Sequence, residues 1–173
     1  TIGDAFTGTT MAQVENYVLA NGAGNHTYTI AHSGQTVTDQ DTGGTNTANI
    51  NAGLSNVTLN AVAGGGANNV VNSLGGGTNL AVTTGGGTDT VNLAGGHTGA
   101  NVKLGGNNDI LNVTGVVAGT LDGEGHAANP PGDTLHINNT ADLVGATVSN
   151  FETLDFAANA SVSMTAATWD QFV

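Results

Sequence analysis

A glycine-rich phrase recurs about every ten residues through the middle of this chain. A short fixed period of this kind is typical of one supersecondary unit stacked on copies of itself, so it indicates a solenoid and not a globular catalytic core. The phrase reads AGGGANNVV from Ala63, LGGGTNLAV from Leu74, TGGGTDTVN from Thr84, AGGHTGANV from Ala94 and LGGNNDILN from Leu104. Its sixth place holds Asn68, Asn79, Asp89, Gly99 and Asp109 in turn.

Short strands alternate with these glycine clusters. Five triplets have two apolar outer residues around a middle residue that is small, polar or charged, the pattern of a short strand with two side chains inward and one outward. The expected inward residues are Val57, Leu59, Leu80, Val82, Val91, Leu93, Val102, Leu104, Leu111 and Val113. A unit with one strand is half a turn, so a full coil takes about twenty residues. Asn68, Asp89 and Asp109 then line one edge, and Asn79 and Gly99 line the other.

The pattern predicts an all-β fold, a parallel β-solenoid or β-roll with short helical caps at its ends. Residues 1–26 are expected to form an N-terminal cap with a helix over about 11–20, because Thr10 and Gln13 have capping-box spacing. The roll is expected over 27–164, with the Pro130-Pro131 pair in an excursion loop. Residues 165–173 are expected to form a C-terminal cap that begins a helix.

Composition excludes several function classes. The 173 residues include thirteen acids against a single Lys or Arg, so rows of phosphates cannot be neutralised and nucleic-acid binding is not expected. No stretch approaches the roughly 20 apolar residues of a membrane span, so membrane insertion is not expected. Divalent cations match the acids best, and a soluble acidic surface is the alternative. The absence of cysteine fits an extracellular protein stapled by metal instead of disulfides.

The phrase TGGGTDTVN resembles the nonapeptide GGxGxDxUx of repeats-in-toxin proteins at every defined place except the first, and LGGNNDILN has Asn107 where a Gly belongs. The segments Gly132–Leu135 and Val148–Leu154 resemble a module of bacterial surface-layer proteins and large adhesins exported by type I secretion. The resemblance spans about 42–164. It implies a parallel β-roll whose turns bind Ca²⁺, located outside the cell at the bacterial surface. Three of the five phrases lack the Asp, so few ions are expected.

Calcium takes six to eight oxygen ligands, and glycine turns expose backbone carbonyls that can supply them. The candidate ligands are Asp89, Asp109, Asp122, Glu124 and Asp133, with the turn residues Gly87 and Asn107. Glu152 is either a further ligand or a backbone hydrogen-bond acceptor. The alternative for the turn acids is an Asx-turn without metal.

No enzyme is expected, because the chain has no nucleophile elbow, P-loop or H-E-x-x-H motif. His97, His126 and His136 form no motif and are expected to be surface imidazoles. Asp39 and Asp41 share one strand face, which could suggest glycosidase chemistry, but nothing nearby supplies a cleft or an aromatic sugar platform.

The expected function is that of a non-enzymatic structural protein of a bacterial surface layer or filament. Its expected partners are copies of itself, in a lattice or fibre, and cell-surface polysaccharide. One alternative is an adhesin or ice-binding module, for which Thr36/Thr38, Thr45/Thr47 and Thr88/Thr90 supply T-x-T pairs. The other is the calcium-binding tail of a secreted hydrolase. The sequence leaves open the number of ions, the assembly symmetry and the natural ligand.

Overall fold

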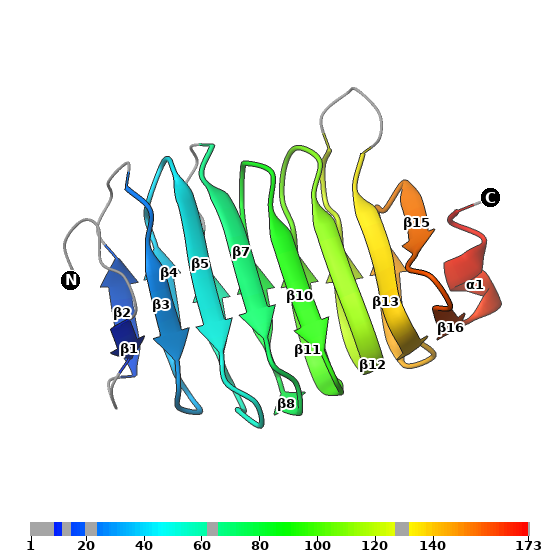
Figure 1. The fold of residues 1–173 in the computed structure, drawn as a ribbon, viewed down its shortest axis with the longest axis horizontal. Coiled ribbons are helices and arrows are strands. Elements are labelled where there is room, and N and C mark those ends of the chain that lie inside the picture. The colour runs from blue at the N-terminus through cyan, green and yellow to red at the C-terminus, as the bar shows by residue number, and fades with distance from the viewer. Residues whose placement is uncertain (1–8, 12–14, 20–23, 62–65, 127–131, 173) are drawn as a thin grey trace.

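The fold is a parallel β-solenoid of about seven turns. The computed structural model describes residues 9–11, 15–19, 24–61, 66–126 and 132–172. Its strands lie side by side along the long axis, from β1 and β2 at one end to α1 at the other (Figure 1). Each coil contributes to two sheets, and every strand pairing among the described residues is parallel. The predicted all-β class and solenoid architecture are confirmed.

One sheet, the first sheet, consists of β1 (Thr9–Met11), β3 (Thr27–Ile30), β5 (Thr45–Ile50), β7 (Asn68–Ser73), β10 (Thr90–Ala94), β13 (Thr134–Asp142), β15 (Thr153–Phe156) and β16 (Ser161–Ser163). The second sheet consists of β2 (Asn16–Leu19), β4 (Thr36–Asp39), β6 (Thr58–Asn60), β8 (Gly77–Thr78), β9 (Ala81–Thr83), β11 (His97–Lys103) and β14 (Ala146–Ser149).

The long strand β12 (Ile110–Asp122) belongs to both sheets. Its first half pairs with β10 and β13, and its second half pairs with β11 and β14. Gly119 has a φ of 132°, and a Cβ there would lie 2.0 Å from the Ala100 carbonyl oxygen. Only glycine fits so close an approach between successive coils. β12 thus runs from the first sheet into the second as one continuous strand, with no loop between its two halves.

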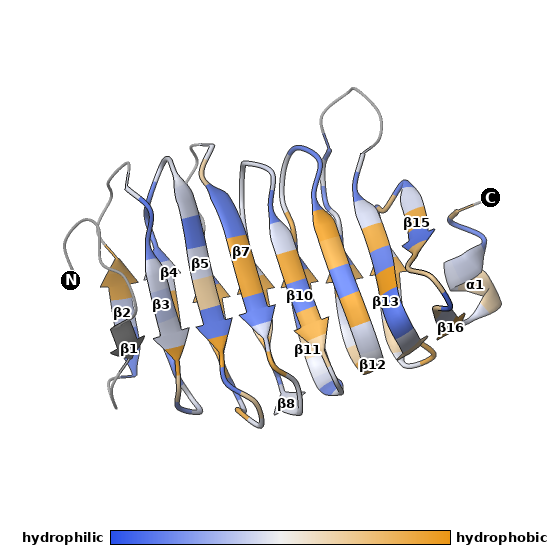
Figure 2. Cartoon of the chain, viewed as in Figure 1, coloured by the Kyte–Doolittle hydropathy of each residue, from blue (hydrophilic) through white to orange (hydrophobic). Residues whose placement is uncertain are grey.

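A thin aliphatic core fills the space between the two sheets. All ten residues predicted to point inward are buried, none more than 3% exposed: Val57, Leu59, Leu80, Val82, Val91, Leu93, Val102, Leu104, Leu111 and Val113. Figure 2 shows the resulting alternation of hydrophobic and hydrophilic bands along β7, β10 and β12. Each buried Val or Leu contributes on the order of 1.5–3 kcal/mol relative to an exposed one.

The predictions for the two caps had different outcomes. The predicted helix over 11–20 is wrong, because Met11 belongs to β1 and residues 16–19 form β2, which pairs with β4. Residues 12–14 and 20 of that prediction lie outside the described residues, as does the predicted Pro130-Pro131 loop. The C-terminal helix is confirmed as α1 (Ala166–Trp169), where the Thr165 side chain accepts a hydrogen bond from the Thr168 N–H.

Candidate metal centre

A column of polar side chains runs inside the solenoid at the edge where each coil enters the first sheet. In each of four steps a backbone N–H donates to a side-chain oxygen one coil further along. Asn69 donates to Asp89 Oδ1 at 2.6 Å, and Asp89 donates to Asp109 Oδ1 at 2.7 Å. Asp109 donates to Asp133 Oδ1 at 2.8 Å, and Asp133 donates to Glu152 Oε2 at 2.8 Å. We call Asp89, Asp109 and Asp133 the carboxylate column.

The carboxylate column is buried and only half satisfied. Asp89, Asp109 and Asp133 are each at most 1% exposed. Their Oδ2 atoms have no hydrogen-bond partner among the residues that the structure describes. A buried charged oxygen without a partner is strongly unfavourable. Either a proton or a cation must therefore compensate each of these oxygens.

Folding raises the pKa of every carboxyl group in the column. Burial raises the pKa of Asp109 to about 8, and the neighbouring charges of Asp89 and Asp133 add to the effect. Burial also raises the pKa of Asp89 to about 6, against the lowering effect of its hydrogen bonds from Asn69. The pKa of Asp133 rises to about 6 through burial, with a further contribution from Glu152. Without metal, each of these carboxyl groups therefore binds a proton more tightly in the folded chain than in the unfolded chain.

Aligning the glycine phrases with one another misplaced one residue of the polar column. The sixth place of the first glycine phrase predicts Asn68 at the level of Asp89. In the structure Asn69 pairs with Asp89 and is buried, whereas Asn68 is exposed and its Oδ1 accepts from the Thr88 N–H. This one-residue shift accounts for the spacing of eleven residues between Asn68 and Asn79, where the later phrases are ten residues apart. The opposite edge is as predicted, because Asn79 lies at the level of Gly99.

The two predicted turn residues lie in the turns that lead into the column. Gly87 has a φ of 125°, and a Cβ there would lie 2.1 Å from the Ala67 carbonyl oxygen. Asn107 has a φ of 87°, a left-handed conformation that Asn tolerates better than most residues. These turns stack directly, because the Gly106 N–H donates to the Gly85 carbonyl at 2.7 Å.

The predicted ligands Asp122 and Glu124 are engaged by other residues of the chain. Asp122 Oδ1 accepts from the Glu124 N–H at 2.9 Å and from the Asn150 amide at 2.7 Å. Glu124 pairs with Lys103 at 2.8 Å. The only Lys or Arg of the chain is thus engaged by Glu124.

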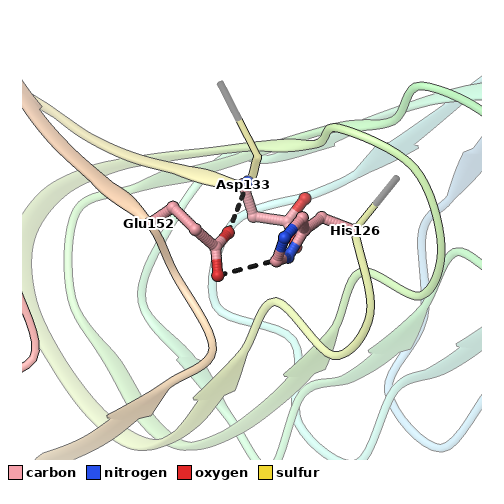
Figure 3. A group of neighbouring side chains, drawn as sticks. All are labelled: His126, Asp133 and Glu152. Carbon is pink, nitrogen blue, oxygen red and sulfur yellow. Dashed lines mark hydrogen bonds and ion pairs between the residues drawn. The ribbon is translucent and has the colours of Figure 1, made fainter. Parts of the chain in front are cut away.

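Asp133 instead lies beside His126 and Glu152 (Figure 3). One ligand atom from each of the three residues lies within 4.8 Å of the others. His126 Nδ1 is 3.2 Å from Glu152 Oε1. Glu152 also accepts a hydrogen bond from the Asp133 backbone N–H, which is one of the two roles expected for it. His126 is the member of this group that the sequence analysis did not propose as a ligand.

Of the three histidines expected at the surface, only His97 is buried, whereas His126 is exposed and His136 lies on the outer face. His26, for which no surface position was predicted, is buried as well. His97 is buried, and burial lowers its pKa. His136 Nδ1 lies 2.8 Å from Asp155 Oδ2 on the outer face. His26 is buried near Asp39 and Asp41, with Nδ1 3.8 Å from Asp39 Oδ1 and 3.9 Å from Asp41 Oδ2.

The pair of carboxylates that could have suggested glycosidase chemistry is inside the solenoid. Asp39 and Asp41 are buried. The Tyr28 hydroxyl donates to Asp39 Oδ2 at 3.5 Å, and burial raises the pKa of Asp39. A sugar chain cannot reach these two groups in the described fold.

The outer face of the first sheet carries two regular columns. Asn72 donates its amide N–H to Asn49 at 3.0 Å, Asn92 donates to Asn72 at 2.8 Å, and Asn112 donates to Asn92 at 2.8 Å. The neighbouring column contains Thr27, Thr47, Val70, Thr90, Ile110, Thr134 and Thr153. Both columns repeat from coil to coil, and the amides of the asparagine column bond to one another.

The described part of the chain contains no helix with the length and apolar character needed to cross a membrane. Comparisons with protein-family models, curated proteins and solved structures found no match to this chain. The chain is therefore classified by its architecture, as a parallel β-solenoid.

Proposed function

We propose that this chain is a non-enzymatic, extracellular structural protein of a bacterial surface layer or filament, whose β-roll is stabilised by calcium and assembles with copies of itself. The observation that carries the proposal is the carboxylate column. Three buried carboxylates, each with one unpartnered oxygen, are repeated at successive coils.

The donor set of the column fits a hard cation. Asp89 and Asp109 offer carboxylate oxygens, and the glycine turns that contain Gly87 and Asn107 offer backbone carbonyls. Bound calcium supplies positive charge that offsets the repulsion between stacked carboxylates. The backbone N–H bonds to each Oδ1 keep the carboxylates aligned whether or not the second oxygen is ligated.

No Lys or Arg side chain can supply that charge in the column. Lys103 pairs with Glu124, and the chain has no other Lys or Arg. Ion-dependent stability suits a protein that folds outside the cell, because calcium is plentiful there. It also suits a chain that has no cysteine and therefore no disulfides to stabilise it. This is the basis for the extracellular location in the proposal.

The ends of the solenoid support self-assembly. In the described residues β1 pairs only with β3, and β15 pairs only with β13, so one side of each strand is open. Open strand edges are templates for another chain. At the C-terminal end Phe156 and Trp169 are 41% and 49% exposed, which gives a second copy an apolar surface to cover. Cell-surface polysaccharide is a further partner class for the regular outer faces.

Electron microscopy with calcium and with chelator tests this function. We expect ordered sheets or fibres in millimolar calcium and dispersed particles after EGTA is added. Dispersed particles under both conditions would contradict the structural role.

An ice-binding or adhesive module is the second candidate, because five threonines share one outer column of the first sheet. Regularly spaced hydroxyl and methyl groups could order water along that face. Val70 and Ile110 interrupt the column, which places this candidate second. Thermal hysteresis of a dilute solution decides it, since an assembly protein produces none. The tail of a secreted hydrolase is a third possibility, which an adjoining catalytic domain in the gene would favour.

A further inference from the structure

The strongest cluster of mixed ligands in the described residues lies at the last member of the carboxylate column. His126 and Asp133 lie between β12 and β13, Glu152 lies one coil further along, and the three side chains face one another (Figure 3). His126 follows the end of β12, Asp133 precedes β13, and Glu152 precedes β15. The coil register brings Asp133 and Glu152 together, because Thr134 pairs with Thr153.

The two carboxylates are held in the same way. Asp133 uses Oδ1 to accept from the Asp109 N–H, and Glu152 uses Oε2 to accept from the Asp133 N–H. Each then has one oxygen left for another partner. Glu152 Oε1 lies 3.2 Å from His126 Nδ1. Asp133 is 0% exposed, and its Oδ2 has no hydrogen-bond partner within the described structure.

The backbone is shaped for this arrangement. Gly132 has a φ of 74°, and a Cβ there would lie 2.6 Å from Glu152 Oε2. A larger residue would displace the Glu152 carboxylate from the Asp133 N–H. Backbone N–H groups that orient the ligating carboxylates act as the outer shell of a metal site.

We propose that His126, Asp133 and Glu152 bind a divalent transition-metal ion of the Zn²⁺ class. An imidazole nitrogen with two carboxylate oxygens suits zinc and its neighbours, whereas calcium prefers oxygen ligands alone. Three protein ligands leave a position for water. The ion links two successive passages of the chain, and the site uses neither of the side chains proposed for calcium, Asp89 and Asp109.

Titration of the full, untagged chain with ZnCl₂ tests this site by calorimetry, in millimolar calcium at neutral pH. We expect one zinc per chain, and a visible ligand-field absorption when Co²⁺ replaces it. His126→Ala should weaken binding at least tenfold, since an outer-shell change alone costs 10–100-fold. Glu152→Gln keeps the acceptor for the Asp133 N–H and should also weaken binding.

His136→Ala is the matched control, because His136 contacts a single carboxylate, Asp155, on the outer face. It should leave zinc affinity unchanged. Zinc binding that is absent, or that is equal in wild type and His126→Ala, would overturn the proposal. So would a loss as large in His136→Ala as in His126→Ala. Calcium dependence of the melting temperature plays no part in this readout, so failure of one site is distinguishable from failure of the other.

Discussion

The Asp109 carboxylate accepts a hydrogen bond from the backbone N–H of Asp89, one coil away, at 2.7 Å. This bond joins two buried acids that would repel each other if both were ionised. The same contact repeats between Asp109 and Asp133. The account of this protein depends on what compensates the oxygens that these bonds leave unpartnered.

Asp109→Asn and Asp109→Ala separate the hydrogen bond from the charge. Asn keeps an acceptor for the Asp89 N–H, as Asn46 does for the His26 N–H at 3.0 Å, and removes the repulsion between carboxylates. Without metal we expect Asp109→Asn to match or exceed the wild type by up to about 1 kcal/mol. We expect Asp109→Ala to lose about 1–3 kcal/mol, because a buried N–H is left unpaired. Urea denaturation measures both; equal losses would contradict the assigned role of the side-chain oxygen.

The stability of the metal-free protein should fall as pH rises from about 4 to 8. Folding raises the pKa of Asp89 to about 6 and that of Asp109 to about 8, above the ordinary 3.8. A carboxyl group whose pKa is raised by folding contributes its full stabilisation below the unfolded-state pKa. That contribution is lost as pH rises through the folded-state pKa. Melting temperatures in EGTA across this range test the slope, and the double variant Asp89→Asn/Asp109→Asn should flatten it. A wild-type melting temperature that rises with pH would refute the effect.

Gly87 and Gly86 are adjacent in one stacked turn and should respond in opposite ways to alanine. Gly87 has a positive φ, and its Cβ would meet the Ala67 carbonyl at 2.1 Å, so Gly87→Ala should cost at least about 2 kcal/mol. A Cβ on Gly86 meets nothing within 4 Å. Gly86→Ala should be neutral or stabilising by up to about 1 kcal/mol. Denaturation midpoints of the two variants decide, and similar losses would show that the turn is packed differently.

The asparagine ladder on the first sheet should contribute measurably to stability. Asn92 donates to Asn72 and accepts from Asn112, so Asn92→Ala removes two hydrogen bonds and should cost about 1–2 kcal/mol. Asn101→Ala is the control, because Asn101 is exposed on the second sheet and should change stability by less than about 0.5 kcal/mol. If the free energies of unfolding of the two variants differ by less than that amount, the asparagine ladder does not contribute to stability.

The sequence predicted most of the architecture because its inward positions repeat at each coil. Val91 and Leu93 could be assigned inward from alternation alone, and both are buried. The prediction of an N-terminal helix rested on the capping-box spacing of Thr10 and Gln13. It was wrong because residues 16–19 pair as a strand with β4. Local propensity is a weak guide where a neighbouring strand is available.

The candidate site was predictable only in part. Asp89 and Asp109 follow regular turns, so their alignment could be read from the period. His126 and Glu152 could not be brought together from spacing, because the coil from Ile110 to Thr134 is longer than its neighbours and breaks the twenty-residue step. Asp122 and Glu124 looked equivalent to Asp133 in sequence, and contacts with Asn150 and Lys103 set them apart.

The thermal melt of the wild-type chain in millimolar calcium and in EGTA, near pH 8, tests the central claim most directly. A ligand that binds only the folded state adds about 2.7 kcal/mol of stability at a hundredfold excess over its Kd. We expect calcium to raise the melting temperature, magnesium to substitute poorly and Asp109→Ala to lose much of the gain. Identical melts with calcium and with EGTA would contradict the account, and would mean that calcium does not compensate the carboxylate column.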